Sequence, residues 1–134
     1  MATISDTVLV LDSWAFIEEF FDGPQRPQLD ARRSLARRHV TVRDALVESY
    51  SYILRKTRPT VAREWWRVMR ESSLVVLEPS LADVDAMADQ TPVEAGLSMV
   101  DLAVAWAARK QKVTEVASGD RGFQALGITP LFAR

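Results

Sequence analysis

Apolar residues along the chain gather in short runs that are separated by longer amphipathic stretches. The runs are rich in Val, Ile and Leu, and they predict β-strands at residues 8–11, 74–77, 113–117 and 128–132. The first two runs are apolar throughout, which is typical of parallel strands whose sheet is covered on both faces.

The stretches between these runs carry apolar residues at helical spacing. They predict helices at 14–21, 29–38, 43–56, 61–71, 81–89 and 99–111, and a short turn at 121–126. Breaks fall at Pro59, at Pro79 and in the segment "DGPQRP" at 22–27. Strands and helices therefore alternate, which predicts an α/β fold with a doubly wound sheet of parallel strands, flanked by helices on both faces. The length of 134 residues fits a single domain over 1–134.

Three aspartates fall where predicted strands give way to helices. Asp12 follows the first strand, Asp120 follows the strand at 113–117, and Asp101 lies in the first turn of a helix, at capping-box spacing from Ser98. Helix capping would explain any one of them alone. In open α/β sheets, however, ligands bind outside the carboxyl ends of the strands, so three acids at one edge favour a cluster.

A carboxylate cluster implies a particular chemistry. Converging carboxylates repel one another unless a cation lies between them, and such hard oxygen ligands select Mg²⁺ or Mn²⁺. A centre of this kind can activate water and stabilise the charge of an in-line phosphoryl displacement, which predicts phosphodiester hydrolysis. The chain has no cysteine, a single histidine (His39) and neither a Gly-x-Ser-x-Gly nor a P-loop motif, so thiol, paired-imidazole and nucleotide-loop chemistries lack their residues.

Charge is divided unevenly along the chain, although the net charge is only −1. Residues 26–70 hold 12 of the 17 Lys and Arg with four acids, a net charge of +8, and the remaining residues have a net charge of −9. One surface could therefore meet a polyanion. The absence of cysteine, of a basic signal-type N-terminus and of an apolar stretch of about 20 residues leads us to expect a cytoplasmic protein with no membrane contact.

Basic and aromatic residues alternate within the helix predicted at 61–71. Arg63, Arg67 and Arg70 recur at helical spacing and could bind RNA phosphates as a set, although a solvated helix face explains each one alone. Trp65 and Trp66 could stack on unpaired bases, but packing is the favoured interpretation for both.

The helix predicted at 43–56 carries a further acid, Glu48. The apolar stripe of this helix lies opposite Glu48 and Asp44, so the pattern alone predicts that Glu48 is solvated.

Four segments together resemble PIN-domain proteins, and more narrowly the VapC-like ribonuclease toxins of type II toxin–antitoxin systems. They are "VLVLDSWAFIEEF", "ALVESYSYIL", "LSMVDLAVAWAARK" and "VASGDRGFQALG", which span nearly the whole chain. The family has Ser or Thr after the first Asp and two places before the last, and Ser13 and Ser118 occupy those positions.

The resemblance implies a PIN-like fold and a metal-dependent endoribonuclease, a hydrolase of RNA phosphodiester bonds. It makes Asp12, Glu48, Asp101 and Asp120 the catalytic, metal-binding acids for Mg²⁺ or Mn²⁺, with Ser13 and Ser118 in support. It also implies a cognate antitoxin that binds and inhibits the toxin, and commonly a homodimer.

Two positions leave the assignment open. Asp44 lies one helical turn from Glu48 and competes for its role, and Gly119 stands where the family often has a larger polar residue. Two other functions also fit the sequence. One is a catalytically silent PIN-like module that binds RNA or protein; the other is a PIN nuclease that matures RNA without an antitoxin.

Overall fold

A computed structural model of the chain describes residues 7–134, and its centre is a parallel sheet of five strands. The strands are β1 (Val8–Leu11), β2 (Arg38–Val42), β3 (Val75–Leu77), β4 (Glu115–Ala117) and β5 (Thr129–Pro130). Their order across the sheet is β3-β2-β1-β4-β5, and every neighbouring pair is parallel. The predicted α/β fold with a doubly wound sheet is confirmed.

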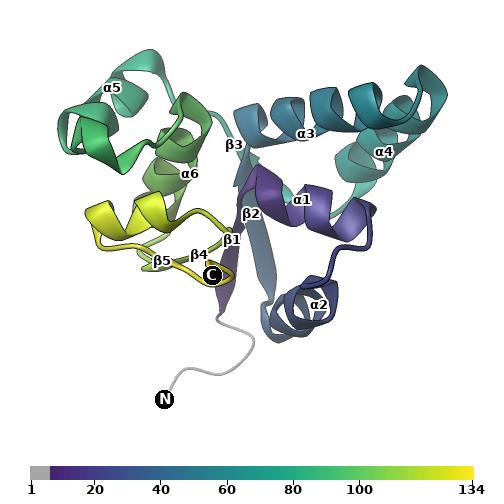
Figure 1. Ribbon diagram of the computed structural model, residues 1–134, viewed down its shortest axis with the longest axis horizontal. Helices are drawn as coiled ribbons and strands as arrows, with labels where there is room; N and C mark the ends of the chain where they lie inside the picture. The colour runs from purple at the N-terminus through teal and green to yellow at the C-terminus, as the bar shows by residue number, and fades with distance from the viewer. Residues whose placement is uncertain (1–6) are drawn as a thin grey trace.

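Helices cover both faces of this sheet (Figure 1). One face carries α1 (Ser13–Phe20), α2 (Arg26–Leu35), α3 (Arg43–Lys56) and α4 (Pro59–Glu71). The other carries α5 (Leu81–Asp89), α6 (Met99–Lys110) and the 3₁₀ helices η2 (Val93–Ala95) and η3 (Arg121–Leu126). Within residues 7–134 no helix is long and apolar enough to cross a membrane. The first six residues, on which part of the expectation of no signal peptide rests, lie outside this description.

The alternation of side chains along β1 produces two separate cores. Val10 points to the face covered by α5 and α6, where it packs with Val104 and Val116. Leu9 and Leu11 point to the opposite face and pack with residues of α1, α3 and α4. Because both faces of the central strand are buried, its sequence is apolar throughout, as predicted.

One strand, β2, was not among the four predicted strands, and this prediction is corrected by the structure. The helix predicted at 29–38 included Arg38, but α2 ends at Leu35 and Arg38 begins β2. β2 is buried only from Val40 to Val42, so its apolar signal is short. The predicted break at 22–27 is also too long, because Pro27 lies in the first turn of α2, where a missing N–H costs nothing.

A buried threonine joins the ends of β1 and β2. Thr41 is fully buried, and its hydroxyl donates a hydrogen bond of 2.7 Å to the carbonyl oxygen of Leu11. This bond satisfies a polar side chain that would otherwise be costly to bury, and it fixes the backbone next to Asp12. This role of Thr41 was not predicted, and its only signal in the sequence is a polar residue between Val40 and Val42.

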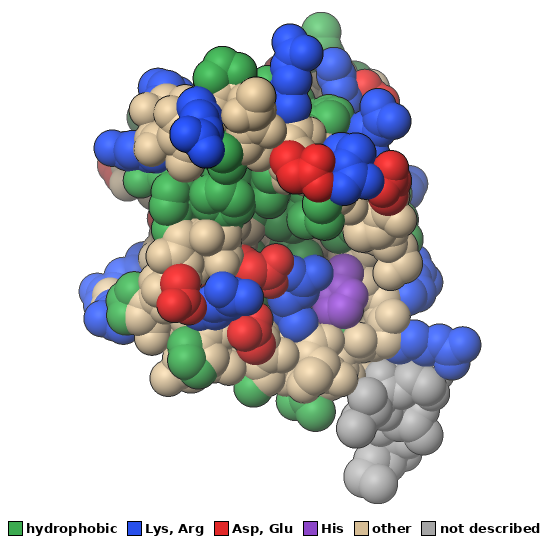
Figure 2. Space-filling model, turned by 90° about the vertical axis from the view of Figure 1, so that its right-hand side faces the viewer, with side chains coloured by type: hydrophobic (Ala, Val, Ile, Leu, Met, Phe, Trp, Pro, Cys, Tyr) green, Lys and Arg blue, Asp and Glu red, His purple; other side chains and the backbone are tan. Residues whose placement is uncertain are grey.

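An apolar hollow lies between α1 and α4. Figure 2 shows hydrophobic side chains gathered there between two bands of charged side chains. Phe20, Val61, Trp65 and Val68 contribute most of its lining. Trp65 itself is buried and packs edge to face on Phe16, which agrees with the packing role favoured for it from the sequence.

Candidate active site

The topology of the sheet brings two strand ends together where the chain changes direction. The chain builds β1, β2 and β3 outward in one direction, then returns to place β4 on the other side of β1. The segments that follow β1 and β4 therefore leave toward opposite faces, with α1 on one and η3 on the other (Figure 1). Such a switch point opens a crevice at the carboxyl ends of the strands.

Asp12 occupies this switch point with both carboxylate oxygens engaged. It is only 3% exposed. The backbone N–H of Ser13 donates to Oδ1 at 2.8 Å, which caps α1, and the hydroxyl of Ser118 donates to Oδ2 at 2.7 Å. The β1–β4 register pairs Leu11 with Ala117, so it places Asp12 and Ser118 side by side.

Ser118 connects the first acid to the last. Its buried hydroxyl donates to Asp12 and also accepts a hydrogen bond of 3.1 Å from the backbone N–H of Asp120. Asp120 in turn caps η3, because its Oδ1 accepts from the N–H of Gly122 at 2.8 Å. One serine hydroxyl therefore fixes the positions of both aspartates.

Asp101 completes the predicted capping box at the start of α6. Its Oδ2 accepts from the N–H of Ser98 at 3.0 Å, and its own N–H donates to the Ser98 hydroxyl at 3.1 Å. Asp101 also lies near Asp120, whose negative charge acts on the Asp101 carboxyl group.

Glu48 reaches the same group from α3. The hydroxyl of Ser13 donates a hydrogen bond to the Glu48 carboxylate, so this side chain turns toward α1 although the residue is exposed. The competing acid, Asp44, is exposed in the first turn of α3 and makes no hydrogen bond or ion pair within residues 7–134. The structure thus brings Glu48, and not Asp44, into contact with the serine beside Asp12.

The four carboxylates influence one another electrostatically. The pKa of Asp12 is raised to about 7, chiefly by burial and also by the neighbouring charges of Asp101 and, more weakly, Glu48, while its two hydrogen bonds act in the opposite direction. Burial also raises the pKa of Asp101, and Asp120 adds to this increase. The mutual repulsion therefore extends across the whole group.

The donor set suits a hard divalent cation. All four side chains are carboxylates, the ligand type that Mg²⁺ and Mn²⁺ prefer, and a cation would relieve the repulsion that raises the pKa of Asp12. Within the described part of the chain, no three His, Cys, Asp or Glu side chains are already gathered closely enough to hold an ion.

The position of Trp14 explains why residue 119 is a glycine, where the family often has a larger polar residue. The Trp14 ring stacks on Phe132 with ring centroids 5.0 Å apart. A Cβ atom on Gly119 would lie 2.9 Å from the indole nitrogen of Trp14, so the indole occupies the space that a larger residue would need. The absence of a side chain at 119 is therefore a packing requirement of this chain.

The predicted RNA-binding arginines lie apart from the acids. Arg63, Arg67 and Arg70 all project from α4, where they line a pocket between α3 and α4 together with Trp66. They do not enter the group formed by Asp12 and its neighbours. His39 lies on β2, and its Nε2 donates to the carbonyl oxygen of Arg33 at 3.0 Å, which is a structural contact.

Comparisons with known proteins support the fold. No protein-family model matches the sequence, and no curated protein matches it. The fold is similar to a solved structure of VapC20 from Mycobacterium tuberculosis, described as a sarcin-ricin loop cleaving toxin, with a TM-score of 0.78. The match covers 96% of this chain and 99% of that one at 14% identity. This likeness shows that the chain has the PIN-like fold expected from its motifs.

The raised pKa of Asp12 predicts how stability depends on pH when no divalent cation is present. A folded-state pKa of about 7, against an unfolded value of 3.8, means that the folded protein retains a proton that the unfolded chain has lost. Stability should therefore fall as pH rises from about 4 to about 7, by up to about 4 kcal/mol. Asp12→Asn should remove most of this fall, which urea unfolding in chelator across this pH range would measure.

Asp44→Asn is the matched control, because it removes one exposed carboxylate from α3 without touching the group around Asp12. If the wild type and Asp12→Asn lost stability in parallel as pH rises, burial of Asp12 would not control the effect.

Proposed function

We propose that this chain is a metal-dependent endoribonuclease of the VapC type, which hydrolyses RNA phosphodiester bonds as the toxin of a type II toxin–antitoxin pair. The observation that carries the proposal is that Asp12, Glu48, Asp101 and Asp120 lie near the switch point between β1 and β4, in pairs related through a serine or through their charges. The PIN-like fold, shared with a toxin that cleaves the sarcin-ricin loop, supports the same conclusion.

The roles of the acids follow from their surroundings. Asp12, Asp101, Asp120 and Glu48 would hold Mg²⁺ or Mn²⁺, which when bound supplies water activation and stabilises charge on the phosphoryl group. Ser118 keeps Asp12 and Asp120 at a fixed separation, and Ser13 links Asp12 to Glu48. Because Asp12 has a pKa of about 7, it must release a proton to act as a ligand, so activity should increase with pH through this range.

The biological setting is proposed from the same resemblance. We expect a cognate antitoxin that covers the site, a homodimer and a location in the cytoplasm. A small open reading frame next to the gene would support the toxin assignment. Its absence would favour a PIN nuclease that matures RNA without an antitoxin.

A second candidate function has its own structural support. Asp12 caps α1, Asp101 completes a capping box and Asp120 caps η3, so each aspartate already has a structural role without any metal. A catalytically silent module that binds RNA or protein would need nothing more from them. This candidate does not explain why three caps and Glu48 lie near the same strand ends, where Asp12 is subject to repulsion from Asp101 and Glu48, and Asp101 to repulsion from Asp120.

Cleavage of RNA by the purified protein tests the main proposal. Wild type should cleave single-stranded RNA in Mg²⁺ or Mn²⁺ and lose activity in chelator. Asp12→Asn and Asp120→Asn should each reduce the rate at least about 100-fold, because charge stabilisation by the ion is worth several kcal/mol. Circular dichroism should show that both variants are folded. Equal cleavage by wild type and folded variants would refute the proposal.

Metal titration separates the nuclease from the silent module. Mn²⁺ should raise the unfolding midpoint of the wild type, with a stabilisation of about 2.7 kcal/mol at a hundredfold excess over Kd. Asp12→Asn should show little stabilisation. Samples of each protein in chelator, without Mn²⁺, give the baseline unfolding midpoint. A wild type that is insensitive to Mn²⁺ across concentrations and pH would favour the silent module.

The two acids of α3 can be distinguished directly. Glu48→Gln removes the carboxylate bound to Ser13, and it should lower cleavage about tenfold or more. Asp44→Asn removes an exposed carboxylate one turn away on the same helix and should leave cleavage within about twofold of wild type. If Asp44→Asn lowered cleavage and Glu48→Gln did not, Asp44 would be the acid that α3 contributes to the site.

A further inference from the structure

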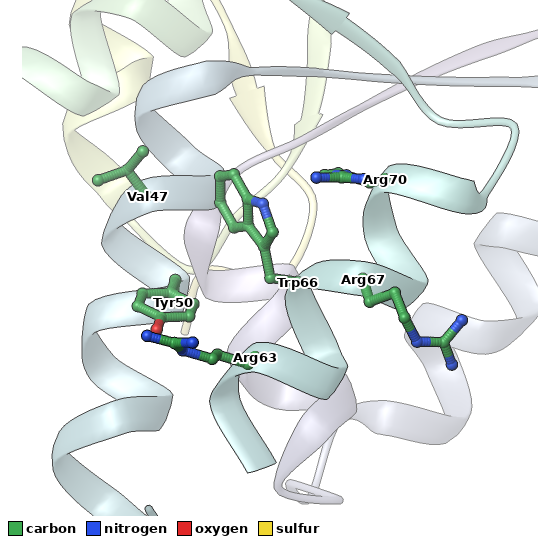
Figure 3. Close-up of a pocket in the computed structure, with 6 residues that line it drawn as sticks. All are labelled: Val47, Tyr50, Arg63, Trp66, Arg67 and Arg70. Carbon is green, nitrogen blue, oxygen red and sulfur yellow. The ribbon is translucent and has the colours of Figure 1, made fainter. Parts of the chain in front are cut away.

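The pocket between α3 and α4 combines aromatic and cationic side chains (Figure 3). It has a volume of about 460 Å³. Tyr50 from α3 and Trp66 from α4 meet there edge to face, with ring centroids 5.7 Å apart, and both rings contribute to the lining. Trp66 is only half-buried, so part of its indole surface is available to a ligand.

The three arginines of the pocket differ in how they are engaged. Arg67 is bound by Glu64 and Glu71 of its own helix, and its guanidinium extends away from Trp66 (Figure 3). Arg63 and Arg70 are exposed and form no ion pair or hydrogen bond within residues 7–134. Arg63 reaches toward Tyr50 in the same view. Two uncompensated positive charges therefore border the aromatic surface.

The apolar hollow between α1 and α4 differs from this pocket in the charge of its lining. Its lining includes Glu64 and no arginine or lysine. The positive charge of α4 is thus directed to the pocket with Tyr50 and Trp66, where an anionic aromatic ligand would find both complementary charge and a ring to stack on.

α3 links this pocket to the proposed active site. Glu48 faces Ser13 of α1, while its neighbours Val47 and Tyr50 line the pocket on the side of α4. The pocket and Glu48 therefore lie on different sides of the same helix, α3, whose diameter with side chains is about 10 Å. An RNA strand whose phosphodiester lies at the acids could cross α3 and place flanking nucleotides in the pocket.

We propose that the pocket formed by Tyr50, Arg63, Trp66 and Arg70 binds unpaired nucleotides of the RNA substrate that flank the cleaved bond. A base stacks on Trp66, which is a sequence-tolerant contact, and Arg63 and Arg70 bind the adjacent phosphates. The proposal rests on the proposed ribonuclease function, and it adds a subsite that selects single-stranded over double-stranded RNA.

Binding of a short synthetic single-stranded RNA of mixed sequence tests the subsite, with Asp12→Asn as the common background so that no cleavage occurs. Arg63→Gln and Arg70→Gln should each weaken binding about tenfold and reduce the slope of log K against log salt by about 0.7. Arg67→Gln makes the same charge change on the same helix, but it should alter affinity less than about threefold. A loss with Arg67→Gln as large as with Arg63→Gln would overturn the proposal.

Substitution of Trp66 tests the stacking contact separately. Trp66→Leu should weaken binding about tenfold without changing the salt slope, and Trp66→Phe should retain most of the affinity because it keeps an aromatic face. A blunt-ended RNA duplex should bind all of these variants equally. Unaltered single-strand binding by folded Trp66→Leu would overturn the proposal, and a weaker dimer of that variant in sedimentation would then assign the pocket to a second copy of the chain.

Cleavage kinetics distinguish a failure of the subsite from a failure of the proposed function. With Asp12 intact, Trp66→Leu should raise KM about tenfold and leave kcat within about twofold, whereas loss of the acids lowers kcat. If the wild type cleaves RNA and Trp66→Leu keeps the wild-type KM, the subsite alone is wrong. If no RNA is cleaved while the binding differences hold, the pocket binds RNA and the proposed nuclease is wrong.

Discussion

The hydrogen bond from Ser118 to Asp12 joins the two strand ends on which the candidate site depends. It crosses from β4 to β1 at the place where the order of the strands reverses. Since the same hydroxyl also accepts from the backbone of Asp120, the loop after β4 cannot shift without disturbing the carboxylate after β1. Of the remaining acids, Glu48 is joined to this pair by a hydrogen bond with Ser13, and Asp101 is held at the start of α6 by Ser98, where the charge of Asp120 acts on it. A small number of contacts to serine hydroxyl and main-chain N–H groups therefore fixes the positions of four carboxyl groups.

The burial of Asp12 gives this arrangement its electrostatic character. Burial in an apolar strand end favours the neutral acid form of Asp12 over the charged carboxylate. The two donors present, the N–H of Ser13 and the hydroxyl of Ser118, offset only part of the cost. The fold thus tolerates an unfavourable group at its centre, a situation more typical of functional sites than of purely structural ones.

Much of this architecture could be predicted from the sequence because the relevant signals are local. Strand β1 and helices α3 and α5 lie where the hydrophobic pattern placed them, and the capping box of α6 was visible in the spacing of Ser98 and Asp101. Strand β2 could not be recognised in the same way, since its first two residues are polar and it is stabilised by neighbours distant in sequence. The direction of Glu48 was equally hidden, because helical periodicity indicates which face is apolar but not which exposed residue meets another helix. Its contact with Ser13 depends on how α1 and α3 pack.

The contact between Trp14 and Gly119 restricts the order in which this site can change. A side chain at 119 requires that the indole at 14 first become smaller or move, and the indole is stacked on Phe132 near the end of the chain. Substitutions at three positions far apart in sequence are consequently interdependent: a change that is tolerated on one background disrupts packing on another. The surroundings of these acids would therefore diversify through coupled replacements, and a residue introduced singly at 119 from another protein of this fold would disrupt packing whatever its own chemistry.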